Sequence, residues 1–276
     1  MKSEIEFLYN VLDILQGYLQ DLILVGGFAA LLYRFHEDAE EIGIPHLITY
    51  DVDLASEAEV PIRGQKSIHE LLETAGLRCE LTGNADQPIV KYYPQEDQGE
   101  IFYVEFLSPL SGSEIKRNGE HDITQSIQKD LPAQKLRYLD LLLQKPLVVH
   151  TSSLPFLEKH PDLIVKVPHP GMYIMQKVLT LQERKRSDRI KDFAYIYQTL
   201  FCFRKNLTPL ASQYANLIVK TEWKRWYSKF IRLVNEKFGS QVSEGSIEAS
   251  HILDEVTPEM VSAAVMRFID KCPGIE

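Results

Sequence analysis

The residues best suited to chemistry in this chain are two aspartates, Asp51 and Asp53, in the segment LITYDVDL at 47–54. The segment alternates apolar and polar side chains, which predicts a strand. Its apolar face carries Ile48, Tyr50, Val52 and Leu54. Both carboxylates then lie on the other face, with Cα atoms about 6–7 Å apart. Because two ionised carboxylates repel each other at that distance, a divalent cation such as Mg²⁺ would stabilise the pair. A solvated pair at a sheet edge is the other interpretation.

Two glycines, Gly26 and Gly27, lie between a short buried strand expected at 21–25 and a helix expected at 28–35. Glycine at the start of a helix lets a phosphate approach the backbone N–H groups without meeting a Cβ. A tight, closely packed turn from strand to helix is the alternative. The chain contains neither a Gly-x-x-x-x-Gly-Lys-Ser/Thr loop nor Gly-x-Gly-x-x-Gly, so the usual ATPase and dinucleotide folds are not indicated.

A third carboxylate, Glu105, interrupts the otherwise apolar segment EIFYVEFL at 100–107 and shares a strand face with Ile101 and Tyr103. A charge in such a segment must face solvent, a partner or a metal. If this strand pairs with the strand of Asp51 and Asp53, three carboxylates converge. They could then hold two metal ions for in-line phosphoryl or nucleotidyl transfer. An exposed glutamate on an edge strand is the alternative.

The elements that must position these residues change in type along the chain. The first part shows a helix at 3–19, another at 64–75, and strands at 77–82, 88–93 and 100–107 besides those above. A proline-rich connector is expected at 145–168, followed by helices at 169–184, 188–203, 209–220, 222–238 and 257–271. We therefore predict an α+β fold, with a mixed-sheet domain and flanking helices at 1–150 and a helical C-terminal domain at 151–276.

Composition restricts the class of protein. The 276 residues are 45% hydrophobic and 25% charged, which is typical of a globular protein with a core and excludes disordered, collagen-like and disulfide-scaffold classes. We expect no membrane helix because no run of about 18 apolar residues occurs. The first ten residues do not resemble a secretory signal, and three scattered cysteines favour a reducing compartment, so we expect a cytoplasmic protein.

Charge is unevenly distributed although the net charge is −9. The segment 177–232 holds 13 Lys or Arg and 4 Asp or Glu residues, a local excess of nine positive charges. A polyanionic partner would meet this half, unless the charges are only the solvated faces of helices. Trp223, Trp226 and Tyr227 within it could stack on bases, or could form core beneath a basic outer face.

Taken together, the motifs resemble the DNA polymerase β-type nucleotidyltransferase superfamily. The resemblance rests on LVGGFAA at 24–30, TYDVDL at 49–54 and VEFL at 104–107, which follow that superfamily's order of a Gly-Gly or Gly-Ser turn, Asp-x-Asp/Glu and a third acid. The second half resembles the helical half of bacterial stand-alone members, including AbiEii-like toxins. Its matching residues are VPHP at 167–170, Tyr173, Lys177, Arg184 and KDF at 191–193.

The resemblance implies transfer of a nucleoside monophosphate from an NTP to an acceptor hydroxyl, with release of pyrophosphate. It implies that Asp51 and Asp53 bind Mg²⁺, or Mn²⁺ in its place, and through the metal the β- and γ-phosphates. Glu105 would complete a second metal position and help to deprotonate the acceptor. Gly26 and Gly27 would present amides to the triphosphate.

Two residues of the second half receive roles from the same resemblance. Lys177 would reach the leaving phosphates from the helical half, and Asp192 would hold Lys177 or Arg184, or contact the nucleotide. For Lys177 a surface lysine is the alternative. For Asp192 the alternative is a charge at a helix N-terminus that satisfies free N–H groups.

Three departures from the superfamily pattern are visible. Gly27 stands where many members have serine, 23 residues separate Gly27 from Asp51, and Glu105 replaces the usual aspartate. The extra methylene of Glu105 shifts the third ligand by roughly 1.5 Å.

Two other functions stay open, and fold resemblance says little about substrate. One is a nucleotidyltransferase fold that only binds its ligand. The other is a toxin that modifies RNA or protein and has an antitoxin as partner. The expected partners are an NTP and an acceptor, which would be RNA, protein or a small molecule.

Overall fold

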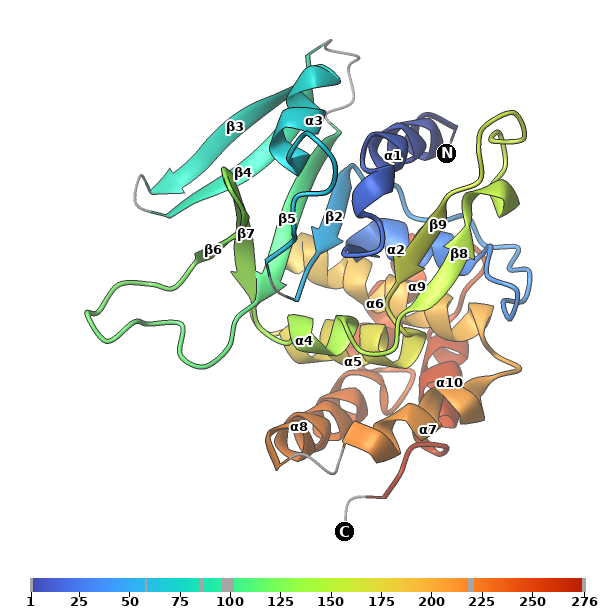
Figure 1. Ribbon diagram of the computed structural model, residues 1–276. Coiled ribbons are helices and arrows are strands. Elements are labelled where there is room, and N and C mark those ends of the chain that lie inside the picture. The colour runs from blue at the N-terminus through green and yellow to red at the C-terminus, as the bar shows by residue number, and fades with distance from the viewer. Residues whose placement is uncertain (1, 58, 85–86, 96–101, 218–220, 275–276) are drawn as a thin grey trace. The chain divides into compact units, whose positions relative to one another are not determined.

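The computed structural model describes residues 2–57, 59–84, 87–95, 102–217 and 221–274 (Figure 1). The chain forms two compact units. The first comprises Met1–His36 and Ile48–Pro168, and the second comprises Glu37–Leu47 and His169–Glu276. A mixed sheet with flanking helices makes up most of the first unit and helices make up the second, so the predicted α+β class is confirmed. In the described part of the chain, no helix is long and apolar enough to cross a membrane.

The first unit opens with α1 (Lys2–Ile14), a short 3-10 turn (Gln16–Tyr18), β1 (Ile23–Val25) and α2 (Gly26–Tyr33). The α1 helix forms because its apolar residues recur at helical spacing and are buried on one face, among them Ile5, Leu8 and Leu12. The α2 helix is buried from its second residue to its last. Its start at Gly26, immediately after β1, places the two glycines at the junction of strand and helix.

The sheet continues with six strands of five to eight residues. These are β2 (Asp51–Ala55), β3 (Leu77–Asn84), β4 (Gln87–Pro94), β5 (Tyr103–Pro109), β6 (Thr124–Gln128) and β7 (Leu131–Leu136). The main order is β1-β2-β5-β4-β3, with β7 beside β5 and β6 beside β7. Pairing is parallel between β2 and β5 and between β5 and β7, and antiparallel between β1 and β2 and between β4 and β5. The parallel contact of β2 with β5 is the one that positions the site.

The expected strand at 47–54 begins only at Asp51. Ile48 and Tyr50 are 50% and 37% exposed, so the apolar face predicted for them is wrong, whereas Val52 and Leu54 are buried. Before β2 begins, the Thr49 backbone N–H donates to the Glu4 side chain of α1, at Oε1, at 3.2 Å rather than to a neighbouring strand.

Other boundaries also differ from those expected from the sequence. The helix expected at 64–75 spans α3 (Ile68–Thr74), where Ser67 and Glu70 form a capping box. Glu100 and Ile101, expected in the strand at 100–107, lie outside the described residues, as do residues 218–220 of the helix expected at 209–220.

The segment 145–168 is more than a connector. After the short helix α4 (Leu139–Leu142), two strands, β8 (Leu147–His150) and β9 (Ile164–Val167), pair antiparallel from Leu147 with Val167 to His150 with Ile164. The prolines of the segment lie outside both strands, where the absence of an N–H removes no hydrogen bond between them. The prediction of a connector over the whole segment is therefore wrong.

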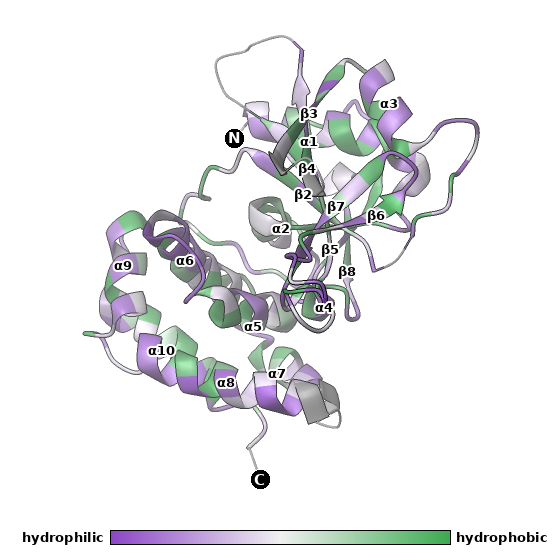
Figure 2. Ribbon diagram, turned by 90° about the vertical axis from the view of Figure 1, so that its left-hand side faces the viewer, coloured by the Kyte–Doolittle hydropathy of each residue, from purple (hydrophilic) through white to green (hydrophobic). Residues whose placement is uncertain are grey.

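The second unit contains six helices in the part that the structure describes. They are α5 (Pro170–Thr180), α6 (Arg186–Cys202), α7 (Leu207–Leu217), α8 (Thr221–Phe238), α9 (Glu244–Ile252) and α10 (Pro258–Ile269). Figure 2 shows hydrophilic and hydrophobic residues interleaved along α8 and α10, as expected of helices with one buried face. On α8, Tyr227 is fully buried, whereas Trp223 and Trp226 are half-buried with stacked rings.

The segment 37–47 belongs to the second unit through hydrogen bonds with α6 and the turn after it. The Glu40 N–H donates to Cys202 O at 2.7 Å, and Gln198 Nε2 donates to Pro45 O at 2.8 Å. The acidic surface excursion expected at 36–41 is thus hydrogen-bonded to the end of α6 and the turn after it, about 160 residues later in the sequence.

Candidate functional site

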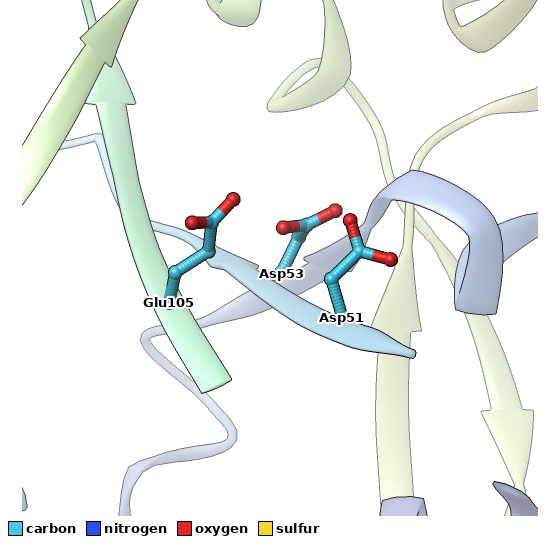
Figure 3. A group of neighbouring side chains, drawn as sticks. All are labelled: Asp51, Asp53 and Glu105. Carbon is cyan, nitrogen blue, oxygen red and sulfur yellow. The ribbon is translucent and has the colours of Figure 1, made fainter. Parts of the chain in front are cut away.

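Three carboxylates, Asp51, Asp53 and Glu105, meet on one face of the sheet. β2 and β5 pair in parallel with Asp53 opposite Glu105, and the period of two along β2 brings Asp51 to the same face. Figure 3 shows the three side chains pointing to the same side. One carboxylate oxygen from each lies within 4.8 Å of the others. Asp53 is 7% exposed, and Asp51 and Glu105 are half-buried.

The chemistry of this donor set fits a hard divalent cation. Carboxylate oxygens are the side-chain ligands that Mg²⁺ and Mn²⁺ take from proteins. Three negative charges held this close also repel each other, and a divalent ion would offset that repulsion. The triad, by which we mean Asp51, Asp53 and Glu105, could therefore hold a metal.

Each outer member of the triad has a polar neighbour. The hydroxyl of Thr49 donates to Asp51 Oδ1 at 2.7 Å, which fixes the orientation of that carboxylate. Lys91, on β4, places its ammonium Nζ 3.4 Å from Glu105 Oε2. The same ammonium lies 3.8 Å from the centre of the Tyr103 ring.

Lys91 and Tyr103 were not predicted from the sequence to lie beside the triad. Lys91 offered the same signal as Glu105, since it is a charged residue inside the apolar segment IVKYY at 89–93. Tyr103 was expected on the face of Glu105, two residues before it, but nothing assigned it a role.

The surroundings of the triad change the acidity of these neighbours. Burial and the negative charges of Asp51 and Glu105 raise the pKa of Tyr103 to about 12. Burial alone would lower the pKa of Lys91, but the Glu105 carboxylate and Tyr103 outweigh it and the net shift is upward. Tyr103 is therefore a neutral hydroxyl and Lys91 a cation at neutral pH.

The glycine turn lies directly against the triad. β1 pairs with β2 so that Val25 faces Asp53, and Gly26 follows with φ +66°. A Cβ at Gly26 would come within 1.9 Å of Asp53 Oδ2. Glycine is thus required here both by the backbone conformation and by the carboxylate beside it. Gly27 is the second residue of α2 and is buried.

The remaining predicted site residues, Lys177 and Asp192, lie in the second unit. Lys177, on α5, is 4% exposed, and its Nζ is 2.6 Å from Asp192 Oδ1. Arg184 Nε is 3.1 Å from the other carboxylate oxygen, Asp192 Oδ2. The two simpler interpretations are wrong, because Lys177 is not a surface residue and Asp192 lies in the interior of α6 rather than at its N-terminus.

Comparison with known proteins gives one family and a distant structural neighbour. A family model described as "Nucleotidyltransferase" matches residues 10–219, a range that includes every site residue predicted above. Among solved structures, the chain is similar to an antigenic nucleotidyltransferase-like protein from Paracoccidioides brasiliensis, with 15% identity and a TM-score of 0.36. That match covers 83% of this chain and 91% of the other. No curated protein matches the chain.

Proposed function

Because the chain belongs to the nucleotidyltransferase family, we propose that it is a Mg²⁺-dependent enzyme that transfers a nucleoside monophosphate from an NTP to an acceptor hydroxyl. The observation that carries this proposal is the parallel register of β2 and β5, which sets Asp53 opposite Glu105. Without that register, the carboxylate of Glu105, 52 positions after Asp53 in the sequence, would not lie within 4.8 Å of those of Asp51 and Asp53.

The reaction consists of one displacement at the α-phosphorus. The acceptor oxygen forms a bond to this phosphorus while the bond to the oxygen that bridges to the β-phosphate breaks, and pyrophosphate leaves. Divalent ions, when bound, would supply charge stabilisation for the phosphate oxygens and lower the pKa of the acceptor hydroxyl. Asp51 and Asp53 would hold the metal and orient the triphosphate, and Glu105 would take the proton of the hydroxyl.

The glycine turn supports a position for the triphosphate. α2 begins at Gly26, so the positive end of its dipole lies beside the Asp53 carboxylate. The amides of Gly26 and Gly27 would donate to phosphate oxygens there. A triphosphate bound in this way would contact both the metal that Asp53 holds and the backbone amides at the start of α2.

We propose that Lys177 and Asp192 act on the nucleotide as a pair. The 2.6 Å ion pair supports a role for Asp192 in orienting the ammonium of Lys177, which would then neutralise charge on the leaving phosphates. The resemblance to the AbiEii-like branch supports a toxin as a narrower version of the same chemistry, with RNA, a protein or a small molecule as acceptor.

Calorimetric titration with each NTP, with and without Mg²⁺, tests the proposal. We expect Mg²⁺-dependent heat that disappears in Asp51→Ala and persists in Asp254→Ala, a matched change at an exposed aspartate of the second unit. Incubation with α-labelled NTPs and a cell extract then identifies the labelled acceptor. Mg²⁺-dependent NTP binding without transfer of label would favour the alternative of a nucleotidyltransferase fold that only binds its ligand. An absence of heat with every NTP would contradict the proposal.

A further inference from the structure

Glu105 lies between an acid and a base on neighbouring strands. On one side, the parallel register of β2 and β5 places Asp53 opposite it. On the other side, the antiparallel register of β4 and β5 places Lys91 opposite it. The sheet order β2-β5-β4 therefore fixes a row of Asp53, Glu105 and Lys91 across three adjacent strands. Side chains directly opposite each other on one face are the pairs that interact most strongly across a sheet.

Lys91 has two contacts that hold its ammonium in this row. Its Nζ is 3.4 Å from Glu105 Oε2 and 3.8 Å from the centre of the Tyr103 ring. The side chains of Lys91 and Glu105 are 23% and 15% exposed, so solvent screens the pair only in part. The face of an aromatic ring attracts a cation by its quadrupole, without using any carboxylate oxygen. The ammonium of Lys91 can therefore stay over the Tyr103 ring when the Glu105 carboxylate binds another cation.

A divalent ion at Glu105 and the ammonium of Lys91 would act against each other. Both are attracted to the same carboxylate, and the two cations repel each other at a separation of a few ångströms. Metal binding at this carboxylate must therefore weaken the pair of Lys91 with Glu105. Asp51 is not subject to this competition with Lys91, because its carboxylate accepts a hydrogen bond from the neutral hydroxyl of Thr49.

We propose that Lys91 is the resident counter-ion of Glu105, which holds this carboxylate in the metal-free protein and releases it, while staying over the Tyr103 ring, when a divalent ion binds. This inference rests on the proposed function, because it requires a divalent ion at the triad. Lys91 is then a positioning residue for nucleotidyl transfer. It keeps Glu105 aimed at the metal position and lowers the affinity of that position for the ion.

Titration of the full chain with Mn²⁺ alone, followed by calorimetry, tests the inference. Lys91→Met keeps most of the length of the side chain and removes its charge. We expect it to bind Mn²⁺ about tenfold more tightly than the original protein, because the ion then meets a Glu105 carboxylate that no ammonium already holds. Lys91→Arg keeps the charge and should bind Mn²⁺ as the original protein does. Lys91→Gln is the second neutral variant if Lys91→Met does not fold.

A double-mutant cycle separates action through Glu105 from a general effect of charge. In Glu105→Gln the carboxylate for which both cations compete is gone, so adding Lys91→Met should change Mn²⁺ affinity by less than about threefold. An equal gain in both backgrounds, or unchanged or weaker binding in Lys91→Met, would overturn the inference.

The same titration distinguishes failure of this inference from failure of the proposed function. If the original protein binds Mn²⁺, Asp51→Asn does not, and Lys91→Met binds as the original does, only the role of Lys91 is overturned. If the original protein binds no Mn²⁺, both proposals are overturned. Thermal unfolding of each variant shows that the protein titrated is folded.

Discussion

Gly26 lies against Asp53 so closely that a Cβ on the glycine would come within 1.9 Å of Asp53 Oδ2. The carboxylate therefore occupies the space that any other residue at position 26 would need. Because β1 and β2 pair with Val25 opposite Asp53, this contact is built into the sheet. The glycine turn and the acid pair, 25 positions apart at their first residues, form one structural unit.

We predict that Gly26→Ala displaces Asp53 and abolishes Mn²⁺ binding. A φ of +66° also costs a residue with a Cβ about 1–2 kcal/mol, so the variant should unfold at a lower temperature. The matched control is Gly17→Ala, where an added Cβ would have no neighbour within 4 Å. Calorimetry with Mn²⁺ and thermal unfolding measure both effects. Full metal binding by Gly26→Ala would show that Asp53 is not a ligand.

We predict that Asp51→Ala and Asp53→Ala each abolish transfer and leave the protein folded. Removing one of three neighbouring carboxylates relieves repulsion, so the free energy of unfolding should stay the same or rise slightly. The measurements are transfer of label from an α-labelled NTP and thermal unfolding without metal. A variant that unfolds would point to a structural role for that aspartate.

The local part of the site was predictable from the sequence, whereas the contacts between strands were not. The period of two placed Asp51 and Asp53 on one face, as observed. Whether Glu105 would join them depended on the pairing of β2 with β5, with two other strands between them in the sequence. Lys91 becomes part of the site only through the register of β4 on β5. Strand order and register arise from tertiary packing, which a local pattern does not encode.

The parts of the fold that were not predicted also depend on contacts between segments distant in the sequence. The strands β8 and β9 are four residues long and lie among prolines, so the segment had the composition of a connector. The segment 37–47 is bonded to residues near 200, a contact between distant parts of the chain that no periodicity reveals. By contrast, α1 has a clear apolar stripe, and its existence was predicted although its end was placed too late.

We predict that Lys177→Met destabilises the protein. Removing one partner of a buried ion pair leaves the other charge uncompensated, which typically costs 3–5 kcal/mol. Arg184 still contacts Asp192, so we expect a loss of about 2–3 kcal/mol, and Lys177→Met with Asp192→Leu should lose less than the two single changes added together. Denaturant unfolding measures the three variants. Additive losses would show that Lys177 and Asp192 are not coupled. If Lys177→Met also slows nucleotidyl transfer, the fraction of unfolded protein must be subtracted before the slower rate is assigned to catalysis.

We predict that Tyr103 makes the protein less stable as the pH rises through the range above 10. Its pKa is about 12 in the folded protein, where burial and the charges of Asp51 and Glu105 disfavour ionisation, against 10 for an ordinary tyrosine. Since the folded pKa is the higher one, the folded state retains the proton that the unfolded state loses. The stabilising contribution is therefore complete below pH 10 and disappears between about pH 10 and pH 12.

Denaturant unfolding of the original protein and of Tyr103→Phe over this pH range tests the prediction. Phenylalanine cannot ionise, so the variant should lose less stability between pH 10 and pH 12. Other tyrosines with raised pKa values, such as Tyr92 and Tyr227, contribute equally to both proteins and cancel in the comparison. Parallel pH profiles for the two proteins would mean that burial and the charges of the triad do not raise the pKa of Tyr103. Such a result would also weaken the placement of its ring, and with it Lys91, beside Glu105.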